Sequence, residues 1–243
     1  MAKRATVAGS RFYIGGTPLD VPDADLVEAD FASYSWTEVK GWATLGAVGD
    51  TAASIAVSEI NRARDFTLKG TRNGGTQEHT FNVIPSDAGQ IALLAAQATA
   101  YNYPFKIVLP DAPAPRSSTV TMTVAAPGVV TWTAHGLSVD TPVVFTTTGA
   151  LPTGLTAGTT YYVKAVPTAD TFTVSATVGG SAITTSGTQS GTHTVTTAPT
   201  GSERKFVGVV MATPEQGGEA NTVQAMGCTI AINSNIVRKA ALG

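Results

Sequence analysis

Apolar and polar residues alternate along several stretches of the chain, with the period of two that is typical of half-buried β-strands. Residues 31–39 are predicted to be such a strand. Residues 66–69 and 79–84 are expected to form a hairpin around the turn 72–75, which contains Asn-Gly-Gly. The first 25 residues, rich in Gly, Pro and Asp, predict an extended arm. Further strands are predicted over 54–60, 105–109, 205–213 and 222–233.

One stretch has helical periodicity. Either Ser86 or Asp87 can cap a helix over 88–100, and the sequence around Pro104 ends it. Four apolar residues share one face of this helix, the pattern of a helix packed on a core: Ile91, Leu94, Ala95 and Ala98. Many strands and one late helix predict a mainly β (α+β) fold, an antiparallel sandwich or barrel with one helix.

Composition changes at both ends of a central segment. Residues 117–200 are rich in Thr, Gly and Val, and only Asp140, Lys164 and Asp170 are charged there. Proline-containing linkers, 110–115 and 197–201, flank the segment. The sequence therefore predicts a host domain made of 1–116 and 201–243, with a small all-β module, 117–200, inserted into it. Turn residues divide the module into six short strands, predicted at 119–125, 129–133, 142–147, 160–167, 171–175 and 192–196.

Charge and cysteine content narrow the class of protein. The formal net charge is −2 and only 13% of the residues are charged, so the surface is weakly protected against association. We therefore expect burial in an assembly, or else a neutral Thr/Ser-covered surface. The single cysteine, Cys228, is expected to be buried and structural. No apolar run follows the basic residues 1–4 and none is long enough to span a membrane, so neither a leader nor a membrane anchor is expected.

No grouping of catalytic or metal-binding residues is legible. The chain has no phosphate-binding loop, dinucleotide fingerprint, His-Glu-x-x-His motif or nucleophile elbow. His79, His135 and His193 lie on separate predicted strands or turns. We expect no enzyme activity, no metal and no cofactor. An acidic cluster at 23–30 and a few basic residues at 62–72 are weak signals of any binding function.

The flanks resemble the major tail (tail tube) proteins of tailed bacteriophages in the pattern and order of their segments. The resemblance covers most of 5–116 and 201–243. It is carried by Ser35-Trp36-Thr37-Glu38-Val39, Lys40-Gly41-Trp42 with the Gly-rich loop and Ile55 beyond, Asp65-Phe66-Thr67-Leu68-Lys69-Gly70, Phe81-Asn82-Val83-Ile84 before the helix, Phe206-Val207-Gly208-Val209-Val210 and the last long strand.

The insert separately resembles small β-modules of phage structural proteins. The resemblance lies in the run 151–163, Leu-Pro-Thr-Gly-Leu-Thr-Ala-Gly-Thr-Thr-Tyr-Tyr-Val, and in Thr171-Phe172 and Gly191-Thr192-His193 further on. Glycine and proline in this run make turns, while Tyr161, Val163 and Phe172 are expected to fill a core. An ordinary β-module of another origin is the alternative.

The resemblance implies a virion structural protein, made in the cytoplasm of a bacterial host. Its subunits would form hexameric rings that stack into a tube, joined to tape measure, tail terminator and distal tail or baseplate proteins. Trp42, Leu45 and Val48, in an apolar loop, are the expected ring or tube interface. DNA would pass through the lumen without specific binding, since phosphate contacts would retard it. Three acidic residues are candidates for the lumen wall: Glu38, Glu59 and Asp65.

A different class of function is also open. The Thr-rich insert could bind host glycans, with the flanks serving as an anchor. Aromatic side chains clustered on an exposed face of the insert would favour this alternative. The candidates are Trp132, Tyr161 and Tyr162.

Overall fold

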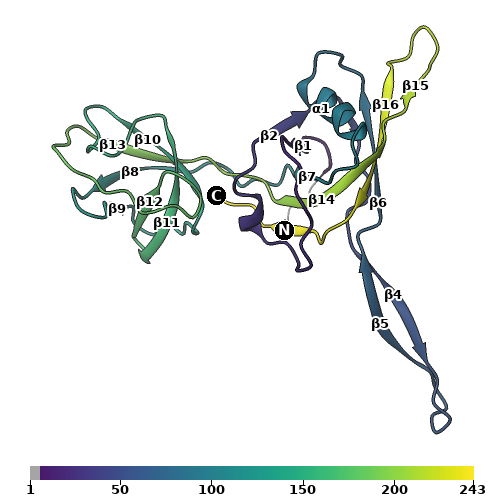
Figure 1. Cartoon of the computed structure of the whole chain (residues 1–243). Helices are drawn as coiled ribbons and strands as arrows, with labels where there is room; N and C mark the ends of the chain where they lie inside the picture. Colours follow the sequence, from purple (N-terminus) through teal and green to yellow (C-terminus); the bar gives the residue numbers. More distant parts are fainter. Residues whose placement is uncertain (1–5) are drawn as a thin grey trace. The chain divides into compact units, whose positions relative to one another are not determined.

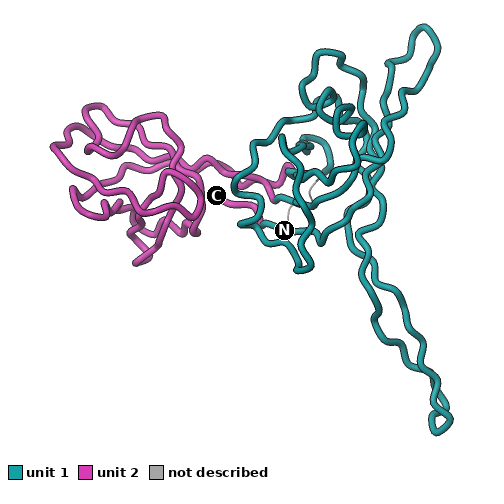
Figure 2. Tube along the Cα trace, viewed as in Figure 1, with its two compact units in different colours: residues 1–109, 203–239 teal, residues 110–202, 240–243 magenta. Residues whose placement is uncertain are grey.

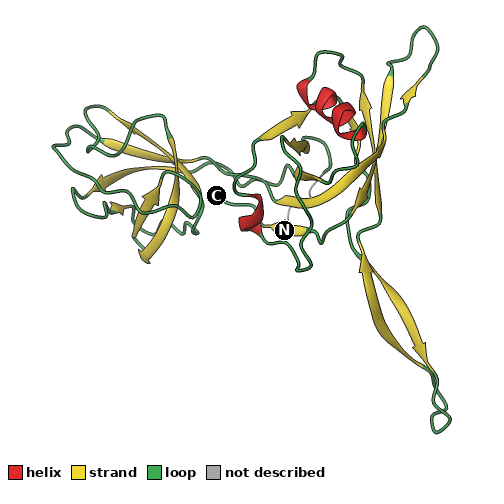
Figure 3. Cartoon of the chain, viewed as in Figure 1, coloured by secondary structure: helices red, strands yellow, loops and turns green. Residues whose placement is uncertain are grey.

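The computed structural model describes residues 6–243; the expectation about a leader rests on residues 1–4, which lie outside them. Strands dominate the chain and there is one α-helix among the described residues (Figure 3), as predicted for a mainly β protein with antiparallel sheets. The chain divides into two compact units (Figure 2): unit 1 holds 1–109 and 203–239, and unit 2 holds 110–202 and 240–243. Both proline-containing linkers belong to unit 2.

Unit 1 is built on a nine-stranded antiparallel sheet (Figure 1). Seven strands run in the order β2-β1-β7-β14-β16-β6-β3, while β15 pairs with β16 and β17 with β14. Only Lys40 and Gly41 separate the two outermost strands, β2 and β3, so the sheet curls until its edges approach each other. The strands are β1 (Arg11–Gly15), β2 (Trp36–Val39), β3 (Trp42–Thr44), β6 (Thr76–Asn82), β7 (Tyr103–Val108), β14 (Glu203–Ala212), β15 (Glu215–Gln216), β16 (Ala225–Ile232) and β17 (Val237–Lys239).

The inside of this curled sheet holds the main core of unit 1. Phe12 lies at its centre, with ring centroids 5.4 to 5.8 Å from those of Trp42, Phe81 and Phe105. Cys228 is buried in the same core, as expected, and burial raises the pKa of its thiol to about 12. The fully buried large side chains include Phe12, Ile14, Phe81, Leu93, Phe105, Ile107, Phe206, Met226 and Ile230.

Two predictions for the first 40 residues are wrong. The expected extended arm contains β1, an interior strand of the sheet between β2 and β7, because Phe12 and Ile14 alternate into the core. The strand expected over 31–39 begins only at Trp36. Its predicted start instead belongs to a short 3-10 helix, η1 (Glu28–Phe31), and Phe31 is buried with Leu26 and Val207 in a second, smaller core.

The hairpin expected between 66–69 and 79–84 is also wrong. β5 (Phe66–Asn73) pairs antiparallel with β4 (Thr51–Val57), and the two form a separate two-stranded sheet. β6 pairs instead with β16 and β3. We call residues 51–73 the arm; in Figure 1 it extends away from the body of unit 1. The turn at Asn73-Gly74-Gly75 is therefore the root of the arm, where the chain re-enters the sheet.

The helix α1 (Ala88–Gln97) begins where the sequence predicts. The face that it buries is not the predicted one. Asp87 caps it and accepts a hydrogen bond from the backbone N–H of Gln90 at 2.9 Å. The helix buries Gly89, Gln90, Leu93 and Ala96. The predicted apolar face, Ile91, Leu94, Ala95 and Ala98, is exposed.

The Asp87 cap gives a first testable prediction. One carboxylate oxygen of Asp87 also accepts from the backbone N–H of Lys40 at 3.2 Å, which ties the helix start to the link between β2 and β3. We expect Asp87→Ala to lower the free energy of unfolding by about 1.5 kcal/mol. Ser86→Ala, the neighbouring cap candidate, is the control and should change it little. Equal effects of the two substitutions in urea denaturation would contradict the assignment.

Unit 2 is a closed antiparallel barrel in the order β10-β11-β12-β9-β8-β13. All six strands expected in the insert are present: β8 (Ser117–Met122), β9 (Val130–Thr131), β10 (Pro142–Thr147), β11 (Thr160–Thr168), β12 (Thr171–Ser175) and β13 (His193–Thr197). Val143, Phe145, Val163, Phe172 and Val195 fill its interior with no exposed area. Closure leaves no unpaired edge, which lets a module of this size form a core of its own.

Candidate interaction surfaces

The two strands of the arm pair with each other and with no other strand of the described chain. Both strands are mostly exposed, and the side chains of Ile55 and Leu68 each keep 49% of their area open to solvent. Ile55 and Leu68 face each other in the strand pairing, and Ile60 is fully exposed beyond them. A lone two-stranded hairpin is at best marginally stable in water. The arm therefore has the properties of an element that another surface covers.

The exposed face of α1 is a second apolar surface. Ile91 is 53% and Leu94 42% exposed, and Ala95 and Ala98 continue the stripe along the helix. Gly89 fixes which face turns inward: a Cβ there would come within 2.3 Å of the backbone oxygen of Glu38. Gln90 does the same, because its buried amide donates to the backbone oxygens of Asn82 and Lys40 at 2.8 and 2.9 Å. An apolar stripe left outside for these reasons is available to a partner.

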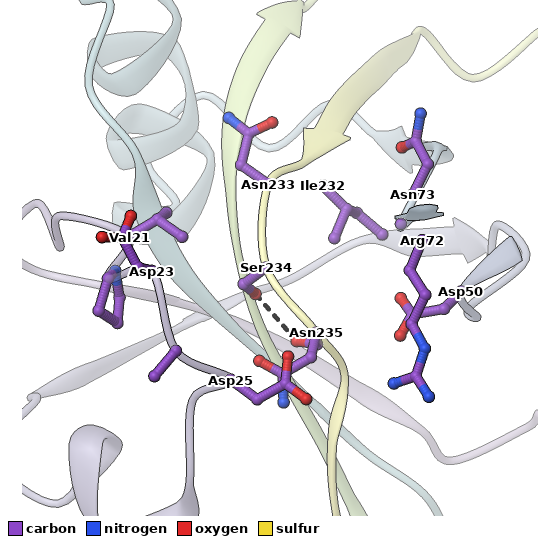
Figure 4. Close-up of a pocket in the computed structure, with 13 residues that line it drawn as sticks. Val21, Asp23, Asp25, Asp50, Arg72, Asn73, Ile232, Asn233, Ser234 and Asn235 are labelled. Carbon is purple, nitrogen blue, oxygen red and sulfur yellow. Dashed lines mark hydrogen bonds between the residues drawn. The ribbon is translucent and has the colours of Figure 1, made fainter. Parts of the chain in front are cut away.

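A pocket of about 350 Å³ lies at the root of the arm (Figure 4). Asp23 and Asp25 stand on one wall, Asp50 and Arg72 on the other, and the stretch 232–235 lies between them. The side chains of Asp23, Asp25, Asp50 and Arg72 are all exposed, and within residues 6–243 they make no hydrogen bond or ion pair with the protein. The pocket is therefore a charged recess whose main charges are unsatisfied.

The three residues expected at a ring interface pack on the core of their own unit. Trp42, Leu45 and Val48 are half-buried against it. Trp42 is part of strand β3, and its indole N–H donates to Nδ1 of His79 at 3.3 Å. Their place in an interface between subunits stays a prediction, and the structure adds an intramolecular role.

The three acidic lumen candidates are not brought together. Glu38 lies on β2, 4.0 Å from Arg11. Glu59 and Asp65 both lie in the arm, between β4 and β5, and Glu59 pairs with Arg62 at 2.8 Å. Two of the three candidates therefore share the tip of the arm and the third lies on the main sheet, and their place in a lumen stays a prediction.

His79 is a buried titratable group of unit 1. Its side chain is 2% exposed and lies 4.6 Å from the ring centroid of Phe12. Nδ1 accepts from Trp42 and from the backbone N–H of Gly46, so the neutral ring carries its proton on Nε2. Burial lowers the pKa of His79 to about 4, and the Thr44 backbone opposes this shift to a smaller extent. This histidine holds the loop after β3 against the core.

Three polar side chains of unit 2 contact one another in the sequence of a nucleophile, its base and an orienting group: Thr147, His193 and Gln189. Thr147 Oγ1 lies 2.8 Å from His193 Nδ1, and His193 Nε2 lies 3.1 Å from Gln189 Oε1. A pocket of about 370 Å³ includes His193 and Gln189 in its lining but not Thr147. Thr147 Oγ1 also accepts from the backbone N–H of Gly149, as in a turn. These contacts hold the ends of β10 and β13 together.

The aromatic residues proposed for glycan binding do not form an exposed cluster. Tyr161 is buried, and its hydroxyl oxygen accepts from the backbone N–H of Thr156 at 2.8 Å. Tyr162 and Trp132 are half-buried, and the Arg116 guanidinium lies over the Trp132 ring at 5.6 Å. The feature that would favour an adhesive module is therefore not found among these three residues.

The described residues contain no group of three or more His, Cys, Asp or Glu placed to hold a metal ion. No helix within residues 6–243 is long and apolar enough to cross a membrane. The chain matches no known protein family, and no curated protein matches it either. Three features of unit 1 are open to a partner: the arm, the α1 stripe and the pocket at the arm root.

Proposed function

We propose that this protein is a self-assembling structural subunit, the tail tube protein of a bacteriophage virion, whose copies form stacked rings around a channel for DNA. The observation that carries the proposal is the arm. It pairs with no other strand of the described chain and exposes large apolar side chains along both strands. Such an element is stabilised when another molecule covers it. In an assembly of identical subunits, the covering molecule is a neighbouring copy.

Two further features support assembly over a monomeric binding or catalytic role. The α1 stripe gives unit 1 an apolar surface separate from the arm, so one subunit has the means to contact more than one neighbour. The low content of charged residues leaves few charges to oppose such contacts. Hexameric rings, the DNA channel and the tail partners rest on the resemblance of the flanks to tail tube proteins.

The proposal is tested on the purified full chain. Sedimentation velocity over a range of concentrations and negative-stain electron microscopy should reveal rings or tubes. A chain that stays strictly monomeric at the highest concentration, with no tubes or rings on the grid, would contradict the proposal.

The α1 stripe provides a variant for the same assay. Ile91→Lys with Leu94→Lys places two charges on exposed positions, so the free energy of unfolding should change by no more than about 0.5 kcal/mol per site. Assembly should be lost or strongly weakened, because burying these charges in an interface is costly. Val178→Lys, at an exposed apolar position in unit 2, is the matched control and should assemble normally. Unchanged assembly of the helix variant would show that the stripe faces solvent in the assembly.

A further inference from the structure

One face of the arm is apolar and the other is polar. Residues opposite each other in an antiparallel pair share a face, and the faces alternate along each strand. The strand pairing therefore places two pairs of large apolar residues on one face: Ile55 with Leu68 and Val57 with Phe66. The intervening positions form the other face and are polar or small: Ser54, Ala56, Thr67 and Lys69. A sheet with two such faces packs on its apolar side and leaves its polar side in water.

The open part of the apolar face has a large pair of residues beside a small pair. Near the tip, the Arg62 guanidinium already covers the ring of the half-buried Phe66, at 5.2 Å from the ring centroid. The large pair farther back, Ile55 with Leu68, has no such cover and is half exposed.

The small pair follows towards the root of the arm. It consists of Ala53 and Gly70, because a Cβ on Gly70 would lie 3.2 Å from the Cβ of Ala53 and 3.3 Å from Cδ1 of Ile55. One residue pair along this face corresponds to a distance of about 7 Å along the strands. The apolar face therefore has a ridge and, about 7 Å away, a hollow.

The α1 stripe has the same two parts. Ile91 and Leu94 form a large pair, and Ala95 and Ala98 form a small pair that follows it along the helix. At 1.5 Å per residue the centres of the two pairs lie about 6 Å apart. A helix is about 10 Å across, enough to cover two strands that lie about 4.8 Å apart. The two surfaces can therefore interdigitate, with the large pair of each over the small pair of the other.

Both surfaces are also free of charge. Residues 88–98 contain no charged residue, and neither does the apolar face of the arm. A nucleic acid or an anionic surface would bring charges to these positions without any group to pair them. A two-stranded sheet becomes stable when a helix packs on it. The only α-helix among residues 6–243 is α1, so the chain itself carries a partner of the required kind.

The two surfaces do not meet within one copy. In Figure 1 the arm points away from the body of unit 1, while α1 lies on that body, and both surfaces stay exposed. The root of the arm is held to the sheet, since the backbone N–H of Ile232 donates to the Gly75 oxygen at 2.9 Å. A Cβ on Gly74 would lie 2.5 Å from Ile232, which leaves the root little room to turn. A contact between the arm and the stripe therefore needs two copies.

We propose that the apolar face of the arm docks on the α1 stripe of a second copy of this chain. The inference rests on the proposed self-assembly and names the two surfaces that join one copy to the next. Because the two surfaces differ, the contact is heterologous: each copy donates an arm and accepts one, as in a closed ring or a filament.

Cross-linking of full-length chains with one added cysteine tests the contact directly. One chain carries Leu68→Cys, in the large pair of the arm, and the other carries Ala98→Cys, in the small pair of the stripe. The native Cys228 is 1% exposed and should not react, which the wild-type chain checks. In an equimolar mixture a short bismaleimide should yield a covalent dimer on a denaturing gel. Neither chain alone should yield one, because each then lacks a cysteine on the opposing surface.

Thr67→Cys is the matched control for the face of the arm. Thr67 precedes Leu68 in the same strand, is exposed, and lies on the polar face. Mixed with the Ala98→Cys chain, it should give at least about tenfold less dimer than Leu68→Cys does, because its thiol points away from the stripe. A dimer from the Leu68→Cys chain alone would show that arms pack on arms and would overturn the proposal.

A pair of lysine variants measures what the contact contributes to assembly. Leu68→Lys and Thr67→Lys both change exposed positions of the arm, so circular dichroism and the urea midpoint should match wild type in each. Leu68→Lys buries a charge against the stripe, and we expect the critical concentration for assembly to rise at least about tenfold. Thr67→Lys leaves its charge in water and should assemble like wild type.

The outcomes distinguish this inference from the proposal beneath it. A wild type that assembles while the mixed cysteine chains do not cross-link would overturn the contact between arm and stripe and leave self-assembly in place. Equal effects of Leu68→Lys and Thr67→Lys would do the same. A wild type that stays monomeric would overturn both. Cross-linking only in the mixture, together with weaker assembly of Leu68→Lys alone, would establish the contact.

Discussion

Replacing Trp42 with Ala is expected to lower the free energy of unfolding by about 3 kcal/mol, even in a subunit that meets no neighbour. The indole ring lies 5.4 Å from the ring of Phe12 and 5.5 Å from that of His79, and its N–H donates to His79. Removing it opens a cavity beside the main core and leaves His79 with one donor fewer. Urea denaturation of dilute, monomeric protein measures the change.

Trp42→Phe is the matched variant, since it keeps an aromatic ring against Phe12 and loses only the indole N–H and some volume. We expect it to lose less than half as much stability as Trp42→Ala. The pair also addresses the interface prediction for this residue. If Trp42→Ala unfolds like wild type but no longer assembles, the side chain acts between subunits and its packing within unit 1 contributes little.

Local signals predict the strands of unit 2, but not which strands pair. Glycine or proline turns lie at most of the strand ends, and residues such as Tyr161 and Val163 alternate into one small core. Three of the six neighbouring pairs in the barrel join strands that are far apart in the chain: β9 with β12, β8 with β13 and β10 with β13. The pairing of all six strands into one closed barrel needed no residue outside the insert.

In unit 1 the local signals favour the wrong strand partner at one position. The sequence predicts the turn at Asn73-Gly74-Gly75, but β6 pairs with β16, whose Cys228 lies opposite His79. Nothing local to 66–84 signals that partner, so the sequence favoured the nearest hairpin. β1 was missed for a related reason: three apolar-rich positions amid Gly, Pro and Asp become an interior strand only when β2 and β7 flank them.

The buried face of α1 shows the limit of periodicity in an alanine-rich helix. Ile91 and Leu94 suggested one face, but Leu93 and Ala96 form another of nearly equal apolar character. The buried face is determined by Gly89, which permits close approach to β2, and by Gln90, whose amide donates hydrogen bonds to two backbone carbonyls. The resulting exposed stripe is one of the surfaces from which assembly is proposed, and it could not be identified as exposed before the strand order was known.

The stability of unit 1 should fall in mildly acidic solution because of His79. The pKa is about 4 in the folded protein, against an ordinary value of 6.5. As the pH falls through 6.5, His79 binds a proton in the unfolded chain but not in the folded chain, so protonation favours unfolding. This contribution to stability is complete above pH 6.5, is reduced by about 2 kcal/mol at pH 5, and is largely lost by pH 4.

His79→Gln isolates the effect, since the amide oxygen can still accept from Trp42 or Gly46 and the side chain does not titrate. Carboxylates titrate equally in both proteins, so their contribution cancels in the comparison. Between pH 7 and pH 5 the wild type should lose about 2 kcal/mol more than the variant in urea denaturation. If the two proteins lose stability in parallel over that interval, His79 is protonated in the folded state near its ordinary pKa, and the loop after β3 must open to admit water.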